Sequence, residues 1–166
     1  MSEKQWLDES GGRSVDQLLE LANTHRIDSI VLAIEGALMA KPEVSSSEEV
    51  VLAVEAMERE VNNGGFEQFF SNSSNLFAPV LVSALERIGA VKTAEIAKRA
   101  SRALGAAPEW TAEQFEGAAL AANEPTRAEL NACDEAYYVA GEDIADRLFD
   151  FIKRNRAEIE IGPSSA

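Results

Sequence analysis

Few side chains of this sequence are suited to acid–base or nucleophilic catalysis. Histidine, cysteine, or serine with a neighbouring base supply most such groups, but His25 is the only histidine and Cys133 the only cysteine. We expect His25 at the surface or at a helix end, and Cys133 in the core among small alanines. The sequence offers no second histidine to share a metal ion with His25. It therefore predicts a protein that is not an enzyme and that holds no metal and no cofactor.

The densest group of polar side chains surrounds a pair of glycines. Glu60, Gln68 and Asn72 could line a polar pocket for carboxylate-based or metal-assisted chemistry. A tight turn between helices also leaves free backbone N–H and C=O groups, which such side chains satisfy. We favour this structural role. Gly64 and Gly65 follow a helix rather than a strand, so we do not expect the phosphate cradle of a nucleotide-binding loop.

Apolar residues recur at helical spacing along most of the chain. There is no alternating strand pattern of useful length and no internal repeat, so the sequence predicts an all-α fold, a single-domain bundle of about seven or eight helices. Capping boxes mark two helix starts, near Ser45 and at Thr111. Glycines end helices at Gly65, Gly89 and Gly105. The expected helices cover about residues 15–38 with a break near 25, 45–62, 66–70, 79–88, 91–104, 111–121, 125–138 and 143–158.

The two ends of the sequence carry little periodic apolar pattern. We predict a flexible N-terminal tail over residues 1–14, a helical domain over 15–158 and a flexible C-terminal tail over 159–166. The first residues lack the apolar run of a signal peptide, and no segment approaches the roughly 18 apolar residues of a membrane span. A lone cysteine forms no internal disulfide. These features predict a cytoplasmic protein that does not enter a membrane.

The net charge of −14 arises from 29 acidic and 15 basic residues. A protein that binds nucleic acid by neutralising its phosphates must supply positive charge, so the sequence excludes direct nucleic-acid binding of this kind. Docking on an anionic membrane is disfavoured for the same reason. Such a charge attracts basic proteins, although acidity can also serve only to keep a domain in solution.

The sign of the charge changes along the chain. Residues 109–150 contain eleven acidic residues and two arginines, whereas residues 87–102 contain five basic residues and one glutamate. At about 100° per residue, the carboxylates of the last expected helix lie opposite its apolar stripe. The helix dipole also favours acidic residues near a helix N-terminus, which is the structural alternative. We predict a partner-binding acidic face formed by Asp134, Glu135, Glu142, Asp143, Asp146 and Asp150.

The stretch from Glu60 to Ser74 forms a long polar and aromatic string around the two glycines. It resembles the signature of the bacterial DNA-mimic protein family. Two later parts of the sequence, Ala84–Ala90 and Asp134–Tyr138 followed by Leu148–Asn155, are similar to further segments of that family. The motif residues, for which we expect a structural role in the turn and the core, are Asn62, Asn63, Gly64, Gly65, Phe66, Gln68, Phe69 and Asn72.

The resemblance implies an all-α, acidic protein that can form a homodimer. It also implies a family in which at least one member acts as a DNA decoy for a transcription regulator. We therefore expect a binding protein that presents its acidic face to a basic protein, such as a DNA-binding regulator. An immunity or antitoxin-like inhibitor of a basic toxin is one alternative, and an enzyme with a pocket near Glu60, Gln68 and Asn72 is another. Asn75 stands where the family usually has a small residue.

Overall fold

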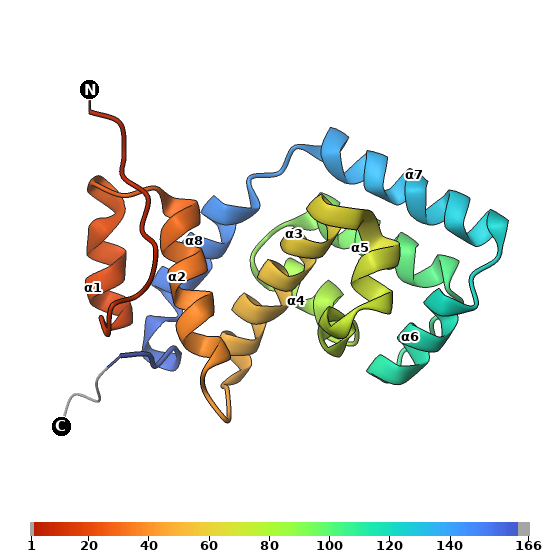
Figure 1. Ribbon diagram of the computed structural model, residues 1–166, viewed down its shortest axis with the longest axis horizontal. Helices are drawn as coiled ribbons and strands as arrows, with labels where there is room; N and C mark the ends of the chain where they lie inside the picture. The colour runs from red at the N-terminus through yellow and green to blue at the C-terminus, as the bar shows by residue number, and fades with distance from the viewer. Residues whose placement is uncertain (1, 163–166) are drawn as a thin grey trace. The chain divides into compact units, whose positions relative to one another are not determined.

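A computed structural model describes residues 2–162 of the chain (Figure 1). Three short 3-10 helices in this range are η1 (Leu21–Asn23), η2 (Ser73–Phe77) and η3 (Arg156–Glu158). The predicted all-α class with about seven or eight helices is confirmed. The eight α-helices of the described residues are α1 (Val15–Glu20), α2 (Ile27–Met39), α3 (Ser46–Ser71), α4 (Leu81–Arg87), α5 (Val91–Ala103), α6 (Ala112–Leu120), α7 (Glu124–Ala140) and α8 (Ile144–Arg154).

The chain divides into two compact units. The terminal unit comprises Met1–Leu52 and Asp143–Ala166, and the central unit comprises Ala53–Glu142. Helices α1, α2 and α8 therefore belong to the terminal unit, and α4 to α7 belong to the central unit. Helix α3 begins in the terminal unit and continues into the central unit.

Amphipathic helices bury their apolar stripes inside the terminal unit. Helix α8 packs on α2, and its stripe of Ile144, Leu148, Phe151 and Ile152 is buried as its spacing predicts. Each fully buried aliphatic or aromatic side chain contributes roughly 1.5–3 kcal/mol, so this stripe is a main source of stability. The facing stripe of α2 is formed by Ile30, Val31, Ile34 and Leu38.

Both ends of the described chain make hydrogen bonds within the terminal unit. The N–H of Gln5 donates to the carbonyl of Thr24 (2.9 Å), and the carbonyl of Gln5 accepts from the N–H of Arg26 (2.9 Å). The N-terminal segment, for which we predicted a flexible tail, is thus hydrogen-bonded through Gln5 to the residues just before α2. At the other end Ile159 is buried. The N–H of Glu160 donates to Glu48 (2.7 Å). Residues 163–166 of the predicted C-terminal tail lie outside the described residues.

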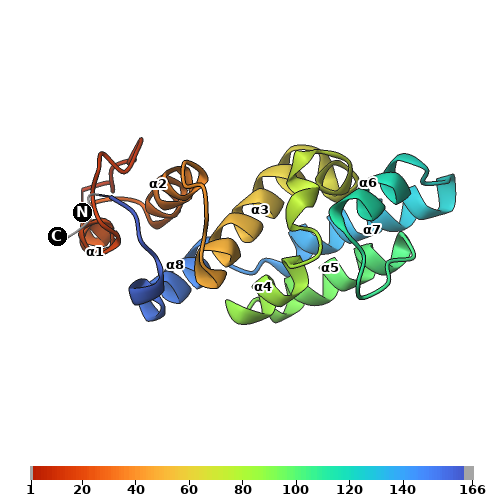
Figure 2. The same cartoon turned by 90° about the horizontal axis from the view of Figure 1, so that it is seen from below.

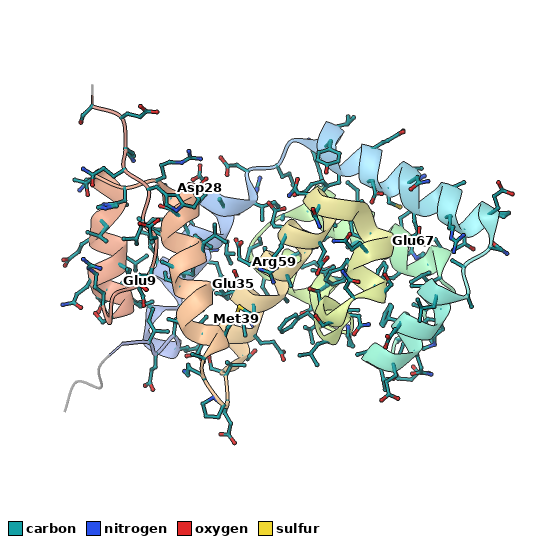
Figure 3. The ribbon with its side chains drawn as sticks, viewed as in Figure 1. Glu9, Asp28, Glu35, Met39, Arg59 and Glu67 are labelled. Carbon is teal, nitrogen blue, oxygen red and sulfur yellow. The ribbon has the colours of Figure 1, made fainter. Side chains whose placement is uncertain are left out.

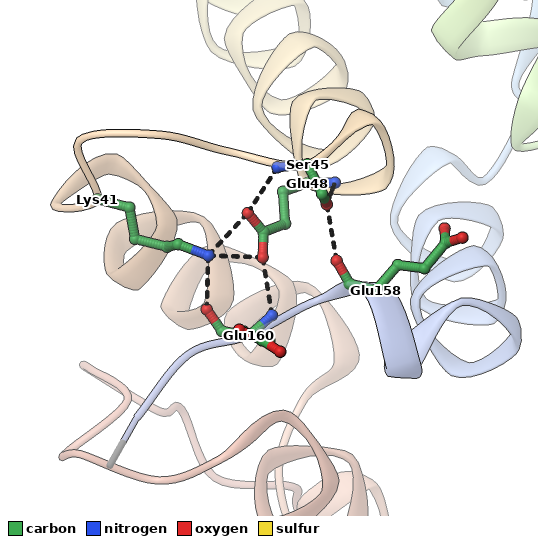
Figure 4. Close-up of polar contacts among 5 residues, drawn as sticks. All are labelled: Lys41, Ser45, Glu48, Glu158 and Glu160. Carbon is green, nitrogen blue, oxygen red and sulfur yellow. Dashed lines mark hydrogen bonds and ion pairs between the residues drawn. The ribbon is translucent and has the colours of Figure 1, made fainter. Parts of the chain in front are cut away.

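A buried carboxylate holds the start of α3. The two oxygens of Glu48 accept hydrogen bonds from Lys41 Nζ (2.7 and 2.8 Å) and from the N–H groups of Ser45 (3.0 Å) and Glu160 (2.7 Å) (Figure 4). The N–H of Glu48 in turn donates to Ser45 Oγ (3.1 Å), which completes the predicted capping box. Burial acts to raise the pKa of Glu48, but Lys41 and the two N–H groups outweigh it and lower that pKa below its ordinary value.

Aromatic rings fill the core of the central unit. Phe66, Phe69 and Phe70 follow a break in α3 and are fully buried, which confirms the predicted short buried helix. Phe70 packs edge-on against Phe69, with ring centroids 5.3 Å apart, and stacks on Phe115 of α6 at 5.4 Å. Helix α5 packs against both α4 and α7 (Figure 2). Helix α5, which carries the basic segment, thus belongs to the same central unit as the aromatic rings.

Candidate functional site

The glycine turn interrupts α3 at Gly65. Its backbone angles, φ 81° and ψ −177°, fall in a region that is essentially restricted to glycine. A Cβ atom added at Gly65 would lie 2.2 Å from Oδ2 of Asp134 on α7. The other oxygen of Asp134 accepts a hydrogen bond from the N–H of Phe66 (2.8 Å), which caps the helical segment after the break. Position 65 therefore requires glycine both for its backbone conformation and for the approach of Asp134.

The polar residues of the motif bond to one another around this turn. Glu60 Oε2 accepts hydrogen bonds from Gln68 Nε2 (2.6 Å) and Asn72 Nδ2 (3.2 Å), and Glu60 Oε1 accepts one from Ser74 Oγ (2.9 Å). Burial acts to raise the pKa of Glu60, but these three donors outweigh it and lower the pKa. Asn75, the unusual residue for the family, is buried and donates to the carbonyl of Phe70 (3.1 Å). Glu60, Gln68 and Asn72, the residues suggested for a pocket, thus form hydrogen bonds with one another at the turn.

Two tyrosines of α7 attach this helix to α3 just before the turn. The Tyr137 hydroxyl donates to Glu58 Oε1 and accepts a bond from Asn62 Nδ2 (3.4 Å). The Tyr138 hydroxyl donates to the carbonyl of Val61 (3.3 Å). Burial beside the Glu58 carboxylate raises the pKa of Tyr137, so this phenol stays protonated and keeps its role as donor.

An ion pair adds to the same contact between α3 and α7. Glu67, labelled in Figure 3, lies in the helical segment after the turn and pairs with Arg127 of α7 at 3.2 Å. Asn63, another motif residue, is exposed. Asn62 and the N–H of Phe66 thus bond to α7, whereas Gln68 and Asn72 bond to Glu60 of α3.

Two carboxylates of the predicted acidic face hold helix ends in the central unit. Besides Asp134 at the glycine turn, Glu142 accepts hydrogen bonds from the N–H groups of Lys92 (3.1 Å) and Thr93 (2.8 Å) and from Thr93 Oγ1 (2.7 Å). Helix α5 has no capping side chain at its own N-cap residue, Ala90, so Glu142 supplies the missing acceptor. Asp134 and Glu142 are therefore positioning residues inside the fold.

Three other carboxylates of that face lie on α8, in the terminal unit. Asp143 is the N-cap residue and accepts from the N–H of Asp146 (3.1 Å), while Asp146 and Asp150 are exposed. A side-chain hydrogen bond with Asp143 raises the pKa of Asp146, with smaller contributions from burial and from the charges of Asp143 and Asp150. We call Asp143, Asp146 and Asp150 the α8 acidic face. The sixth predicted residue, Glu135, is exposed on α7 in the central unit.

A second group of exposed carboxylates, which the predicted face does not include, lies at α6. Glu109 precedes this helix, and Glu113 and Glu116 point away from its buried residues Phe115 and Ala119. In the part of the chain that the structure describes, none of the three glutamates has a hydrogen-bond or ion-pair partner. The three-residue spacing of Glu113 and Glu116 on α6 is a sequence signal for this group, and Glu109 lies before the N-cap residue Thr111. We call Glu109, Glu113 and Glu116 the α6 acidic face.

The histidine and the cysteine occupy the positions expected for them. His25 lies between η1 and α2, where its Nδ1 is 2.9 Å from Thr24 Oγ1. Cys133 is fully buried, and burial raises the pKa of its thiol to about 11. Among residues 2–162 there is no group of three or more His, Cys, Asp or Glu side chains that could hold a metal ion. No helix in this range is both long enough and apolar enough to cross a membrane.

The structure defines an acidic, all-α protein whose polar motif closes an internal turn. Most of the chain, residues 42–155, matches the family described as DMP19-like protein, and the chain belongs to this family. The matched region includes the glycine turn and both acidic faces. Neither a comparison with curated proteins nor one with solved structures finds a match. The DNA-mimic family expected from the sequence agrees with this assignment at the level of the family.

Proposed function

We propose that this protein binds a basic partner through exposed carboxylates and acts as a DNA mimic that occupies the binding site of a DNA-binding regulator. Membership of the DMP19-like family and the net charge of −14 support the proposal. The observation that carries it is the presence, in the described chain, of carboxylates on the α6 and α8 acidic faces that form no ion pair. Exposed carboxylates that form no ion pair are available to the lysines and arginines of a partner protein.

The spacing of these carboxylates suits a site that normally holds DNA. One helical turn separates neighbouring carboxylates by about 5.4 Å along the helix axis. Successive phosphates of one DNA strand lie about 3.4 Å apart along the duplex axis. A helix face with a carboxylate on each turn therefore offers a basic surface a charge density of the same order as a phosphate backbone.

Repulsion within the α8 acidic face also favours a basic partner. The pKa of Asp146 is raised first by its side-chain hydrogen bond with Asp143, then by burial, and then by the charges of Asp143 and Asp150. A lysine or arginine of a partner placed between these carboxylates would relieve the repulsion in addition to forming new ion pairs. Glu135, Asp143, Asp146 and Asp150 thus remain candidate contacts for a partner, whereas Asp134 and Glu142 do not. We propose the α8 acidic face in the terminal unit, and Glu135 and the α6 acidic face in the central unit, each as a contact site by itself.

Affinity capture from an extract of the protein's own cells, at low and high salt, tests the proposal. We expect a basic DNA-binding protein that is released as the salt concentration rises, because screening between exposed charges acts over roughly 8–10 Å near physiological ionic strength. The purified partner, bound to a fluorescent DNA duplex, should be displaced by this protein in an anisotropy titration. Capture of a partner that does not bind DNA, such as a basic toxin, would contradict DNA mimicry and favour an inhibitor of that toxin.

Charge-reversal variants identify the surface that the partner contacts. Asp146→Lys with Asp150→Lys changes the α8 acidic face, and Glu113→Lys with Glu116→Lys changes the α6 acidic face. Glu9→Lys with Glu20→Lys is the matched control, because it alters the net charge equally at two other exposed sites. Equal affinity of all three variants for the partner would show that only the net charge matters and would overturn the proposed faces.

Two finer expectations accompany the proposal. We propose that the protein is cytoplasmic, as expected from the sequence, and that it meets a DNA-binding regulator there. We also propose a homodimer, as the family resemblance implies, which light scattering coupled to size-exclusion chromatography measures directly.

A further inference from the structure

A groove of about 220 Å³ opens on the central unit between the start of α4, the C-terminal half of α5 and the loop that precedes α6. Pro79, Val82, Pro108 and the ring of Phe115 provide its apolar lining, with alanines between them. Phe115 is buried and stacks on Phe70, so the core holds this ring in place. The groove therefore presents a preformed apolar surface, as small-molecule sites do.

The polar part of the groove comes from one turn of α5. Lys98, Ser101 and Arg102 line it. Lys98 already pairs with Glu86 at 3.0 Å and with Glu95 at 2.9 Å. Within residues 2–162, by contrast, neither the Ser101 hydroxyl nor the Arg102 guanidinium has a hydrogen-bond or ion-pair partner. One positive charge and one hydroxyl donor are therefore left for a ligand.

The guanidinium of Arg102 is attracted by the charge of Glu95 on the same helix but forms no ion-pair contact with it in the described residues. The neighbouring arginine of the same helix, Arg99, pairs with Glu129 at 2.5 Å, and Arg127 of α7 pairs with Glu67. A fork of guanidinium N–H groups matches a carboxylate, to which it can donate two parallel hydrogen bonds. The groove thus combines a site for an anionic group with a site for an apolar body.

We propose that this groove binds a small carboxylic acid with an aromatic or compact aliphatic body. The carboxylate binds Arg102 and Ser101, and the body packs against Pro79, Pro108 and Phe115. The size follows from the volume: an apolar cavity of about 150 Å³ holds benzene, so 220 Å³ accommodates one ring with its carboxylate. A single net charge matches the one unpaired guanidinium. This inference is independent of the proposed DNA mimicry, because none of its residues belongs to either acidic face.

Titration of the full chain with benzoate, followed by amide chemical shifts in two-dimensional NMR, tests the proposal. We expect saturable shifts at the amides of residues 101–107 and 115, with a dissociation constant on the order of 1 mM for a small ligand in an open groove. Benzamide, which lacks the charge, and acetate, which lacks the ring, should each bind at least about tenfold more weakly. Equal binding of either compound would overturn the proposed recognition.

Two variants of exposed cations on α5 provide the matched comparison. Arg102→Gln should weaken benzoate binding at least about tenfold, because it removes the charged donor. Lys92→Gln removes a cation of the same helix that does not line the groove, and its benzoate affinity should equal that of the wild type. Equal affinity of the two variants would overturn the assignment of Arg102.

A tripeptide that ends in phenylalanine tests the other source of the same chemistry, the C-terminus of a protein. The free acid is supported if benzoate binds at least as tightly as the tripeptide. Binding of the tripeptide alone would overturn the proposal of a free small acid.

Discussion

Substitution of Gly65 by alanine tests how the glycine turn is held together. A non-glycine residue at φ 81° and ψ −177° costs about 1–3 kcal/mol in backbone strain. The added Cβ also enters the space of the Asp134 carboxylate, which must move and lose its hydrogen bond to Phe66, a bond worth about 1.5–3 kcal/mol because the acceptor is charged. The expected loss of about 3–6 kcal/mol is a large part of the 5–15 kcal/mol that usually separates folded and unfolded states.

Urea denaturation followed by circular dichroism measures this loss as a lower free energy of unfolding. Gly117→Ala is the matched control, since Gly117 lies inside α6 and an added Cβ meets no atom within 4 Å. Alanine is the better helix former there, so we expect a gain of about 0.5–1 kcal/mol. If the free energy of unfolding of Gly65→Ala lay within about 0.5 kcal/mol of the wild-type value, the expected backbone strain and displacement of Asp134 would be wrong.

Three carboxylates should respond differently to substitution. Asp134→Asn keeps an acceptor for the N–H of Phe66, so its stability and its affinity for the partner should match those of the wild type. Asp134→Ala should lose about 1–3 kcal/mol of unfolding free energy in urea denaturation. Weaker partner binding by Asp134→Asn would show that Asp134 contacts the partner. Asp146→Asn should change stability by less than about 0.5 kcal/mol yet weaken partner binding in anisotropy titrations. Because the pKa of Asp146 is raised, wild-type affinity should increase as pH rises through that pKa, and this increase should be smaller in Asp146→Asn. Glu48 has a lowered pKa, so its stabilisation is present above the ordinary value of 4.5 and is lost as pH falls through the lowered pKa. Glu48→Gln should therefore lose about 1–3 kcal/mol at pH 7, and the difference from the wild type should shrink in acid; parallel pH curves would contradict this.

Local signals in the sequence were sufficient to predict the helices. The capping box at Thr111 is present, with the Thr111 side chain and Gln114 bonded reciprocally, and the break at Gly65 follows from residues next to it in the chain. Where a boundary differs, a local reason exists. Helix α8 was expected to reach residue 158 but ends at Arg154, and Asn155 and η3 follow. Asn155 bonds its own side chain to the carbonyl of Phe151 (2.8 Å), which favours a helix end there.

The roles of individual carboxylates could not be predicted in the same way. Asp134 accepts from Phe66, 68 residues away in the chain, and Glu142 accepts from Lys92, 50 residues away. Both lie on the polar side of an amphipathic pattern, as a solvated acid such as Glu135 does. Helical spacing separates polar from apolar positions, but only the packed helices distinguish an acid that caps a distant helix from one that faces solvent.

The hydrogen bonds of Glu60 have a consequence for how this protein can evolve. Gln68, Asn72 and Ser74 all donate to the same carboxylate, so a change at Glu60 leaves all three donors without this acceptor and is selected against whatever the protein binds. The glutamates of the α6 acidic face have no such mutual dependence, and they are free to drift singly. Descendants of one ancestor can therefore retain the turn unchanged while they exchange one target for another.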